Sequence, residues 1–161
     1  MQRKAIYAGS FDPFTLGHLD VVQRVAKSFE RVIVLVGYNK KKNSWLSVAD
    51  RMELVEAATQ HLPNVIVESW SGLTVDFARK YPQSILVRSL RSAADLEWES
   101  AMAWGNSTQF SELETYFLLA QPQWQHLSSS LVRELWHHRG DYQAMLPLSV
   151  YKFLKKMELN P

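Results

Sequence analysis

The sequence predicts an α/β protein with a five-stranded parallel sheet, doubly wound, with helices on both faces and one further helix at the C-terminus. Two observations predict it. Five short apolar runs, rich in β-branched residues, alternate with stretches whose apolar residues recur at helical spacing. The runs are continuous rather than alternating, which is typical of strands buried on both faces of a parallel sheet. Right-handed crossovers would join such strands in a Rossmann-like architecture.

Each expected strand is a short run bounded by polar residues or glycine. The clearest is Arg-Val-Ile-Val-Leu-Val-Gly at 31–37, which is continuous and largely β-branched. Such runs favour strands because branched side chains pack well on a pleated surface. The five strands are expected at residues 4–7, 31–37, 64–67, 84–87 and 115–119.

The expected helices fill the gaps and close the chain. Ser47 opens one of them in a capping-box-like start, and Pro147 suits the first turn of the last. We expect helices at residues 18–28, 47–61, 73–81, 93–109, 129–138 and 147–157. The 161 residues contain no internal repeat or linker, which predicts a single domain over residues 1–161.

Composition excludes several classes of site. The chain has no cysteine, which excludes disulfides, thiolate metal sites and a cysteine nucleophile, and fits a reducing compartment. No apolar run reaches the roughly 18 residues of a membrane span, and the apolar stretch after the basic start is too short for a signal peptide. The formal net charge of +2 is too small to predict a nucleic-acid partner. We therefore expect a cytoplasmic protein with neither nucleic acid nor membrane as a partner.

Ligands of open α/β sheets bind beyond the carboxyl ends of the strands. The first such segment runs from Gly9 through Ser10 and Phe11 to Gly17 and His18. Gly9 allows a tight turn and close approach to a ligand, and Gly17 and His18 come where the first helix begins. A helix N-terminus favours phosphate, and a histidine there can donate a hydrogen bond to it. The alternative is a connecting loop with an incidental histidine.

The string Gly-Ser-Phe-Asp-Pro-Phe-Thr-Leu-Gly-His at 9–18 resembles the signature of nucleotidyltransferases related to class I aminoacyl-tRNA synthetases. Within that superfamily the chain resembles the phosphopantetheine adenylyltransferase family over nearly its whole length. The resemblance implies that His18 stabilises the transition state at the α-phosphate of ATP. It also places Gly9, Ser10, Phe11 and Gly17 at the nucleotide, with Ser10 reaching the acceptor as well.

Basic residues follow two other strands. Lys40, Lys41 and Lys42 follow the strand at 31–37, and a solvated lysine loop is the alternative to a phosphate site. The resemblance implies that Lys42 contacts the acceptor and the reacting phosphates and is catalytic.

Arg88 and Arg91 follow the strand at 84–87, and a surface pair bridged to Asp95 or Glu97 is the alternative there. The resemblance implies that Arg88 holds the acceptor phosphate, and that Arg91 is a catalytic residue on the ATP phosphates. It also places Ser89, Leu90 and Glu99 at the nucleotide.

Ser128, Ser129 and Ser130 precede an apolar helical run, so they predict a helix N-terminus. Capping alone would explain them, but the same groups can hold triphosphate oxygens. Trp124 lies at a strand exit, where its ring can stack on adenine, and Leu127 stands where the family has Ile. By resemblance all five bind ATP.

The acceptor arm gives a weaker signal. Leu73 and Thr74 match family positions along the pantetheine arm, and Asn106 matches an acceptor position, although no basic residue follows it. The chain also departs from the family at Ala8, Leu16 and Ser89, where Pro, Asn and Gly are usual. Ser89 is the departure that could disturb the backbone near the phosphates.

The reaction implied by the resemblance is ATP plus 4′-phosphopantetheine giving dephospho-coenzyme A and pyrophosphate, with Mg²⁺ on the phosphates and a homohexameric assembly. An adenylyltransferase acting on nicotinamide mononucleotide is one alternative, and a non-catalytic nucleotide-binding module is another. No Ser–His–Asp set, dinucleotide fingerprint, Walker loop or metal-ligand spacing is present in the sequence.

Overall fold

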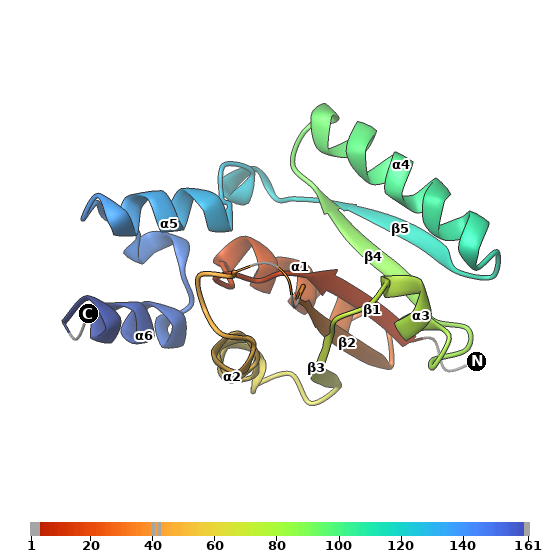
Figure 1. Cartoon of the computed structure of the whole chain (residues 1–161), viewed down its shortest axis with the longest axis horizontal. Coiled ribbons are helices and arrows are strands. Elements are labelled where there is room, and N and C mark those ends of the chain that lie inside the picture. Colours follow the sequence, from red (N-terminus) through yellow and green to blue (C-terminus); the bar gives the residue numbers. More distant parts are fainter. Residues whose placement is uncertain (1–3, 40, 42, 160–161) are drawn as a thin grey trace.

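A computed structural model describes residues 4–39, 41 and 43–159. These residues form five strands, six α-helices and two short 3₁₀ turns (Figure 1). The strands are β1 (Lys4–Gly9), β2 (Arg31–Gly37), β3 (Val65–Trp70), β4 (Ile85–Leu90) and β5 (Glu114–Leu119). The helices are α1 (Leu16–Ala26), α2 (Val48–Thr59), α3 (Thr74–Ala78), α4 (Ala93–Gln109), α5 (Ser129–His137) and α6 (Leu148–Leu159), with 3₁₀ turns η1 (Pro122–Trp124) and η2 (Gln143–Met145).

The five strands make one parallel sheet in the order β3-β2-β1-β4-β5. The chain moves outward from β1 to β3 and then crosses back to β4 on the other side of β1. The exits of β1 and β4 therefore diverge, which makes this point the topological switch of the sheet. The predicted fold class is confirmed, and the exits of β1 and β4 are the place where ligands of such sheets usually bind.

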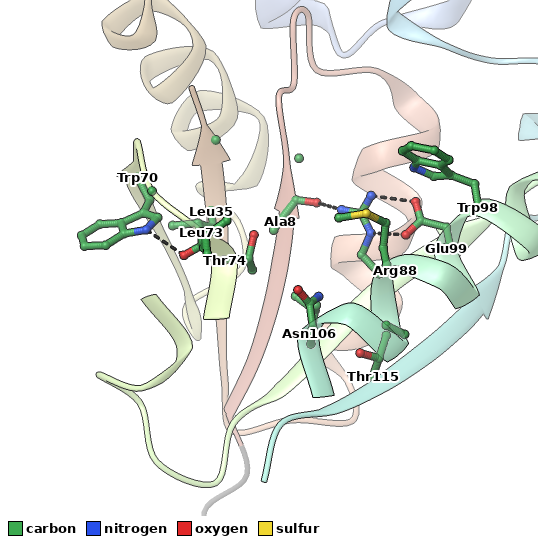
Figure 2. Close-up of a pocket in the computed structure, with 16 residues that line it drawn as sticks. Ala8, Leu35, Trp70, Leu73, Thr74, Arg88, Trp98, Glu99, Asn106 and Thr115 are labelled. Atoms are coloured by element: carbon green, nitrogen blue, oxygen red, sulfur yellow. Dashed lines mark hydrogen bonds and ion pairs between the residues drawn. The ribbon is translucent and has the colours of Figure 1, made fainter. Parts of the chain in front are cut away.

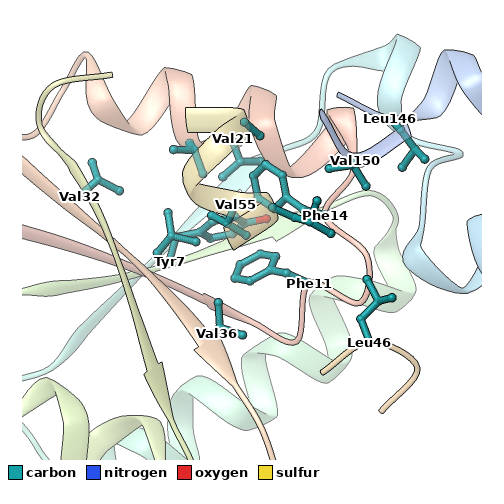
Figure 3. Close-up of a cluster of buried hydrophobic side chains, with 14 of the residues drawn as sticks. Tyr7, Phe11, Phe14, Val21, Val32, Val36, Leu46, Val55, Leu146 and Val150 are labelled. Carbon is teal, nitrogen blue, oxygen red and sulfur yellow. The ribbon is translucent and has the colours of Figure 1, made fainter. Parts of the chain in front are cut away.

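Successive side chains of the strands enter two separate cores, as the period of a strand requires. Tyr7, Val34 and Val36 face the helices α1, α2, α5 and α6, where they form the larger core (Figure 3). Ile6 and Leu35 face the opposite way, toward α3. Both faces of the central strands are thus buried, which explains why their sequences are apolar without alternation.

The side of the sheet formed by α4 and β5 is packed much less tightly. Figure 1 shows α4 running alongside the edge strand β5, at the opposite end of the molecule from α5 and α6. None of the 17 residues of α4 is buried, and β5 consists of exposed and half-buried residues. No helix of the described residues is long and apolar enough to cross a bilayer.

The boundaries differ from the sequence prediction by a few residues. The first helix begins at Leu16, two residues before the expected His18, because Thr15 caps it. The strand expected at 64–67 continues to Trp70, whose polar neighbours Glu68 and Ser69 hid the extension. The turns η1 and η2 have only three residues each, too few to produce a helical period.

Candidate active site

Two pockets open side by side at the exits of β1 and β4. The first, called here the His18 pocket, has a volume of about 290 Å³, and the second, the Trp70 pocket, about 310 Å³. Ala8, Gly9, Arg88 and Glu99 line both pockets. A ligand in one pocket can therefore meet a ligand in the other along this shared wall.

The His18 pocket gathers most of the residues proposed for the nucleotide. They come from the exits of β1 and β4, the first turn of α1, and the segment from η1 into α5, which lie far apart in the sequence. The residues from the prediction that line it are Gly9, Ser10, Phe11, Gly17, His18, Arg88, Ser89, Arg91, Glu99, Trp124, Leu127, Ser128 and Ser129.

The Trp70 pocket lies between the sheet and α4, and its lining is largely apolar (Figure 2). Leu73, Thr74 and Asn106, proposed for the acceptor, all line it. Trp70 closes one side, with its indole N–H donating to the carbonyl of Leu73 at 2.9 Å. An elongated, mainly apolar ligand with an anionic end near Arg88 would suit this space.

His18 is held at the third position of α1 with one ring nitrogen turned to Thr15. The backbone N–H of Thr15 donates to Nδ1 of His18 at 3.0 Å. The imidazole is packed between two aromatic rings, edge-on to Phe11 at 5.1 Å and stacked on Phe14 at 5.5 Å. Since Nδ1 accepts a hydrogen bond, the proton of a neutral ring lies on Nε2, the nitrogen left for a ligand.

The surroundings keep His18 neutral. Burial, followed by the positive charges of Arg91 and Arg88, lowers the pKa of His18 to about 4. A neutral imidazole with its proton on Nε2 is a hydrogen-bond donor that brings no charge of its own. His18 can therefore stabilise an anionic oxygen without acting as a base at neutral pH.

Phe11 adopts a backbone conformation that few aromatic residues take. Its φ is +49°, in the left-handed region, directly after Ser10. The ring turns back over β1, so that a Cβ at Gly9 would lie 2.9 Å from two of its carbons. Gly9 is thus required because the ring of Phe11 occupies the place of a side chain. This conformation costs of order 1–3 kcal/mol and is typical of functional sites.

Three side chains hold the carbonyls of the β1 exit loop. Arg51, only 1 % exposed, donates to the carbonyl of Ser10 at 2.7 Å and to that of Gly37 at 3.1 Å. Ser129 donates to the carbonyl of Pro13 at 2.8 Å, and Arg133 donates to that of Asp12. These bonds fix the loop against the exit of β2 and the start of α5.

Asp12 connects the same loop to the segment that follows β2. Its carboxylate accepts the backbone N–H groups of Trp45 and Leu46, both at 2.8 Å. The loop that carries the lysines is therefore tied back to the β1 exit on its C-terminal side.

Arg88 forms the wall between the two pockets. Its guanidinium donates to both oxygens of Glu99, each at 2.7 Å, and also to the carbonyl of Ala8 (Figure 2). Burial lowers the pKa of Arg88, but the hydrogen bonds and charge of Glu99 outweigh it, so the net pKa is raised. Arg88 is thus a permanent cation whose fork points at the junction of the two pockets.

Arg91 is paired in the same manner with Asp95, one of the two acidic partners that the surface alternative named. The Nε and Nη2 atoms of Arg91 lie 3.0 and 3.1 Å from the carboxylate, and Nη1 donates to the carbonyl of Leu127 at 3.2 Å. The hydrogen bond from Arg91 lowers the pKa of Asp95. Both arginines also line the His18 pocket, so an arriving phosphate can compete with the carboxylates for them.

Ser89 has ordinary backbone angles. Among the described residues only Phe11, Gln83 and Arg139 have positive φ outside glycine, and Ser89 lies within β4. Its hydroxyl is 3.4 Å from that of Tyr7. The backbone at this position therefore does not need the glycine that the family usually has.

The serine run begins α5. Ser128 is the N-cap and accepts from the N–H of Leu131 at 3.1 Å. Trp124 in η1 is half-buried and lies across from Gly17, where an added Cβ would be 3.7 Å from the Cβ of Trp124. The first turns of α1 and α5 thus face one pocket, and both can offer free N–H groups to an anion.

Two of the proposed residues line neither pocket, and a third is outside the part of the chain that the structure describes. Lys42, like Lys40, lies outside the described residues. Leu90 is buried beneath the neighbouring surface, and the exposed Ser130 has its hydroxyl within 3.1 Å of Arg133; neither lines the two pockets.

Sequence reasoning missed several lining residues. Tyr7, Thr15 and Asp95 line the His18 pocket, and Trp98, Met102 and Thr115 line the Trp70 pocket. The spacing of Trp98, Met102 and Asn106 by four residues could have identified a helix face turned to a ligand. No comparable signal marks Tyr7, which is apolar in its pattern and belongs to the strand.

A magnesium ion would find few free ligands on the protein itself. The described residues contain no group of three or more His, Cys, Asp or Glu side chains that could hold a metal. The two carboxylates in the His18 pocket, Asp95 and Glu99, are bound by arginines. This donor set suits an ion that arrives with its own phosphate ligands rather than one held by a protein cage.

Comparison with known proteins gives consistent matches over most of the chain. A family model described as cytidylyltransferase-like matches residues 6–135. The chain is 42% identical to phosphopantetheine adenylyltransferase of Nautilia profundicola, over 96% of this chain and 100% of that protein. It is 43% identical to the protein of the same name from Thermosynechococcus vestitus, with 94% and 90% covered, and 47% identical to that from Nostoc punctiforme, with 89% and 78% covered.

Solved structures with low sequence identity share the fold. One is a putative nicotinate-nucleotide adenylyltransferase from Vibrio parahaemolyticus, with a TM-score of 0.67 at 19% identity, covering 96% of this chain and 99% of that one. Another is a bifunctional NMN adenylyltransferase/ADP ribose pyrophosphatase from Francisella tularensis, with a TM-score of 0.78 at 15% identity. That match covers 99% of this chain and 51% of the other, so this chain corresponds to about half of the bifunctional protein.

Proposed function

The chain belongs to the cytidylyltransferase-like nucleotidyltransferases and, within them, to the phosphopantetheine adenylyltransferase family, and from that premise we propose that it transfers AMP from ATP to 4′-phosphopantetheine. The products are dephospho-coenzyme A and pyrophosphate. One observation carries this proposal beyond family membership: the polar His18 pocket and the apolar Trp70 pocket share a wall at Arg88 and Glu99. A nucleotide and an acceptor with an apolar arm would meet there with their phosphates together.

The reaction is a direct displacement. An oxygen of the acceptor phosphate attacks the α-phosphorus of ATP, the bond from that phosphorus to the bridging oxygen breaks, and pyrophosphate leaves with the electron pair. The acceptor phosphate is already an anion and needs no general base. The protein has to bring two anions together in line and stabilise the charge that develops between them.

His18 supplies a donor where this charge develops. Its Nε2–H is the free side of a ring that Phe11, Phe14 and Thr15 hold in place. We assign this donor to an oxygen of the α-phosphoryl group. Donors of this kind are worth on the order of 100–1,000-fold in kcat, because they act mainly in the transition state.

The two arginines supply the positive charge. Arg88 faces both pockets and would hold the acceptor phosphate, while Arg91 would hold the phosphates of ATP. Each would exchange part of its contact with Glu99 or Asp95 for phosphate oxygens, which suit the same planar fork. Lys42, outside the described residues, is assigned by resemblance to the same phosphates as a third cation.

The remaining residues would select the two substrates. Trp124 offers an aromatic face for adenine, and the first turn of α5 at Ser128 and Ser129 offers N–H groups and hydroxyls for the triphosphate. Leu73, Thr74 and Asn106 line the space assigned to the pantetheine arm.

We also propose that Mg²⁺ enters bound to ATP. Phosphate oxygens and water would be its ligands, because Asp95 and Glu99 are already paired with arginines. When bound, the ion neutralises part of the triphosphate charge. The chain's own contribution is the pair Arg88 and Arg91, which would meet the phosphate oxygens that the ion leaves free.

The exposed face of α4 and β5 supports a homo-oligomer, and we propose the hexamer that the family resemblance implies. Trp104 of α4 is 71% exposed and Leu119 of the edge strand is 70% exposed, and Tyr116 is exposed as well. Large apolar side chains gathered on neighbouring elements are typical of an interface between subunits. We place the protein in the cytoplasm, where its two proposed substrates would be available.

The proposed function is tested by measuring pyrophosphate release from ATP with three acceptor conditions: 4′-phosphopantetheine, nicotinamide mononucleotide, and none. We expect release with phosphopantetheine alone, with dephospho-coenzyme A identified by mass. Release with the mononucleotide instead would support the rival adenylyltransferase, and ATP binding without release under any condition would support a non-catalytic module.

A further inference from the structure

We propose that Thr15 is a positioning residue, which uses the N-cap of α1 to hold the proton of His18 on Nε2. The catalytic consequence of this proposal rests on the proposed function, but the position of the proton does not. Thr15 is 1% exposed and follows Phe14, whose ring stacks on the imidazole. Thr15 lines the His18 pocket but is not one of the charged residues there.

Two polar groups of Thr15 converge on one nitrogen of His18. The backbone N–H lies 3.0 Å from Nδ1, and the hydroxyl oxygen lies 3.1 Å from the same atom. A backbone N–H can only donate, so Nδ1 has to be an acceptor. The hydroxyl can donate to it as well. A proton on Nδ1 would face the amide proton directly, which disfavours both the other tautomer and the imidazolium.

The same contacts make up the capping box of α1. The hydroxyl of Thr15 accepts the N–H of His18 at 3.4 Å, and the side chain of His18 returns to the N–H of Thr15. In most capping boxes a Glu or Gln makes the return bond. Here a histidine makes it, so the geometry that starts the helix also decides which ring nitrogen carries the proton.

The surroundings leave the other nitrogen to the pocket. Phe11 and Phe14 cover the ring from two sides, and Nε2 has no hydrogen-bond partner among the residues the structure describes. The charged groups facing the imidazole are Arg88 and Arg91, whose partners are Glu99 and Asp95. The positive charges of both arginines disfavour a second proton on the ring. They therefore favour a neutral imidazole, as the contacts of Thr15 also do.

The primary test is the tautomer of His18 in the full-length wild-type protein. Nitrogen-15 NMR of histidine-labelled protein separates protonated from unprotonated ring nitrogens, and a His18→Gln sample assigns the signals. We expect Nε2 to be protonated and Nδ1 unprotonated at pH 7. A protonated Nδ1 would overturn the proposal, whatever the protein does with ATP.

Variants then separate positioning from helix capping. Thr15→Val keeps the shape of the side chain but removes its hydroxyl, whereas Thr15→Ser keeps the hydroxyl. Ser47→Ala removes a matched cap, since the Ser47 hydroxyl accepts the N–H of Asp50 at the start of α2. We expect the ratio of the two neutral tautomers in Thr15→Val to shift roughly 2- to 13-fold toward a proton on Nδ1, the change that one lost hydrogen bond makes in an equilibrium constant. The value of kcat should fall, with the KM for ATP little changed.

Thr15→Ser should restore the wild-type kcat and nitrogen signals, and Ser47→Ala should lower the melting temperature without moving either. Equal losses of kcat in Thr15→Val and Ser47→Ala would show that Thr15 acts only as a helix cap, which would contradict the proposal. If Thr15→Val fails to fold, the wild-type tautomer and the Thr15→Ser measurements still decide it. A wild type that releases no pyrophosphate would refute the proposed function and leave the tautomer result standing.

Discussion

At the scale of single residues, the site depends on side chains whose usual charge or conformation is changed by their neighbours. His18 is kept neutral by burial and by two arginines, and Phe11 adopts the left-handed region with its ring in the space that a side chain at Gly9 would need. Arg88 and Arg91 are permanent cations, and the carboxylates of Glu99 and Asp95 fix the orientation of their guanidinium groups. In each case the residue type alone does not specify the property that the chemistry needs.

The titration of His18 tests this description. We expect a pKa near 4 in the free protein instead of the usual value near 6.5. Between these values the unfolded chain binds a proton that the folded chain does not, so stability falls as pH drops from about 6.5 toward 4. NMR titration of the ring gives the pKa directly. A midpoint near 6.5 would mean that His18 is solvated and that the packing described here is wrong.

Ser89→Gly should leave turnover almost unchanged. The backbone there has no positive φ, so glycine relieves no strain. Its one expected effect is a stability loss of about 1 kcal/mol, because the buried hydroxyl of Tyr7 loses a weak partner. Steady-state kinetics and urea denaturation measure the two effects. An inactive wild type that gains turnover on Ser89→Gly would identify the chain as a degenerate relative.

At the scale of elements, the loops after β1 and β2 are held by side chains from helices behind them. Arg51 of α2 bonds carbonyls at the exits of both strands, and Arg133 and Ser129 of α5 bond the β1 exit loop. Buried carbonyls need such donors, since an unmade hydrogen bond in the interior is costly. The site is therefore preorganised in part by two residues that do not line it, Arg51 and Arg133.

Arg51→Met should lower the free energy of unfolding by about 2–5 kcal/mol, because the carbonyls of Ser10 and Gly37 lose their donor. Arg79→Met serves as the exposed comparison, since Arg79 pairs with Asp76 and donates to the carbonyl of Gln109 at the surface, where the loss should be less than about 1 kcal/mol. Chemical denaturation compares them. Equal small losses would show that Arg51 does not hold the loops.

Most elements could be predicted because apolar periodicity decides them. The continuous run at β2 and the serine run at α5 are local signals that tertiary packing did not override. Thr15 and Tyr7 were missed because their roles depend on residues brought together by the fold. Leu90 and Ser130, placed at the nucleotide by their motifs, line neither pocket, so their role there stays a prediction that rests on the motif alone.

At the scale of the whole molecule, helices cover one face of the sheet more completely than the other. The helices α1, α2, α5 and α6 enclose a continuous core, whereas α4 stands off from the sheet and leaves the Trp70 pocket between them. The outer face of α4 and the edge strand β5 expose large apolar side chains. A neighbouring subunit would cover this face, and the pocket lies directly behind it.

Trp104→Glu should therefore weaken assembly. Burying a carboxylate in an apolar interface is costly, so the mass in solution should drop from that of the proposed hexamer, about six times the 18.6 kDa chain, toward that of smaller species. Analytical ultracentrifugation measures it. Leu148→Glu is the control, because Leu148 is similarly exposed but lies on α6, at the other end of the molecule. A monomeric wild type would refute the hexamer.

The central claim is that the two adjoining pockets bring both phosphates together for direct transfer. The most direct measurement is the stereochemical course at the α-phosphorus, followed with a chiral α-thio analogue of ATP and phosphopantetheine. A single in-line displacement predicts inversion of configuration in the thio-dephospho-coenzyme A product. Retention would require two displacements through an adenylylated protein side chain, and it would contradict the account.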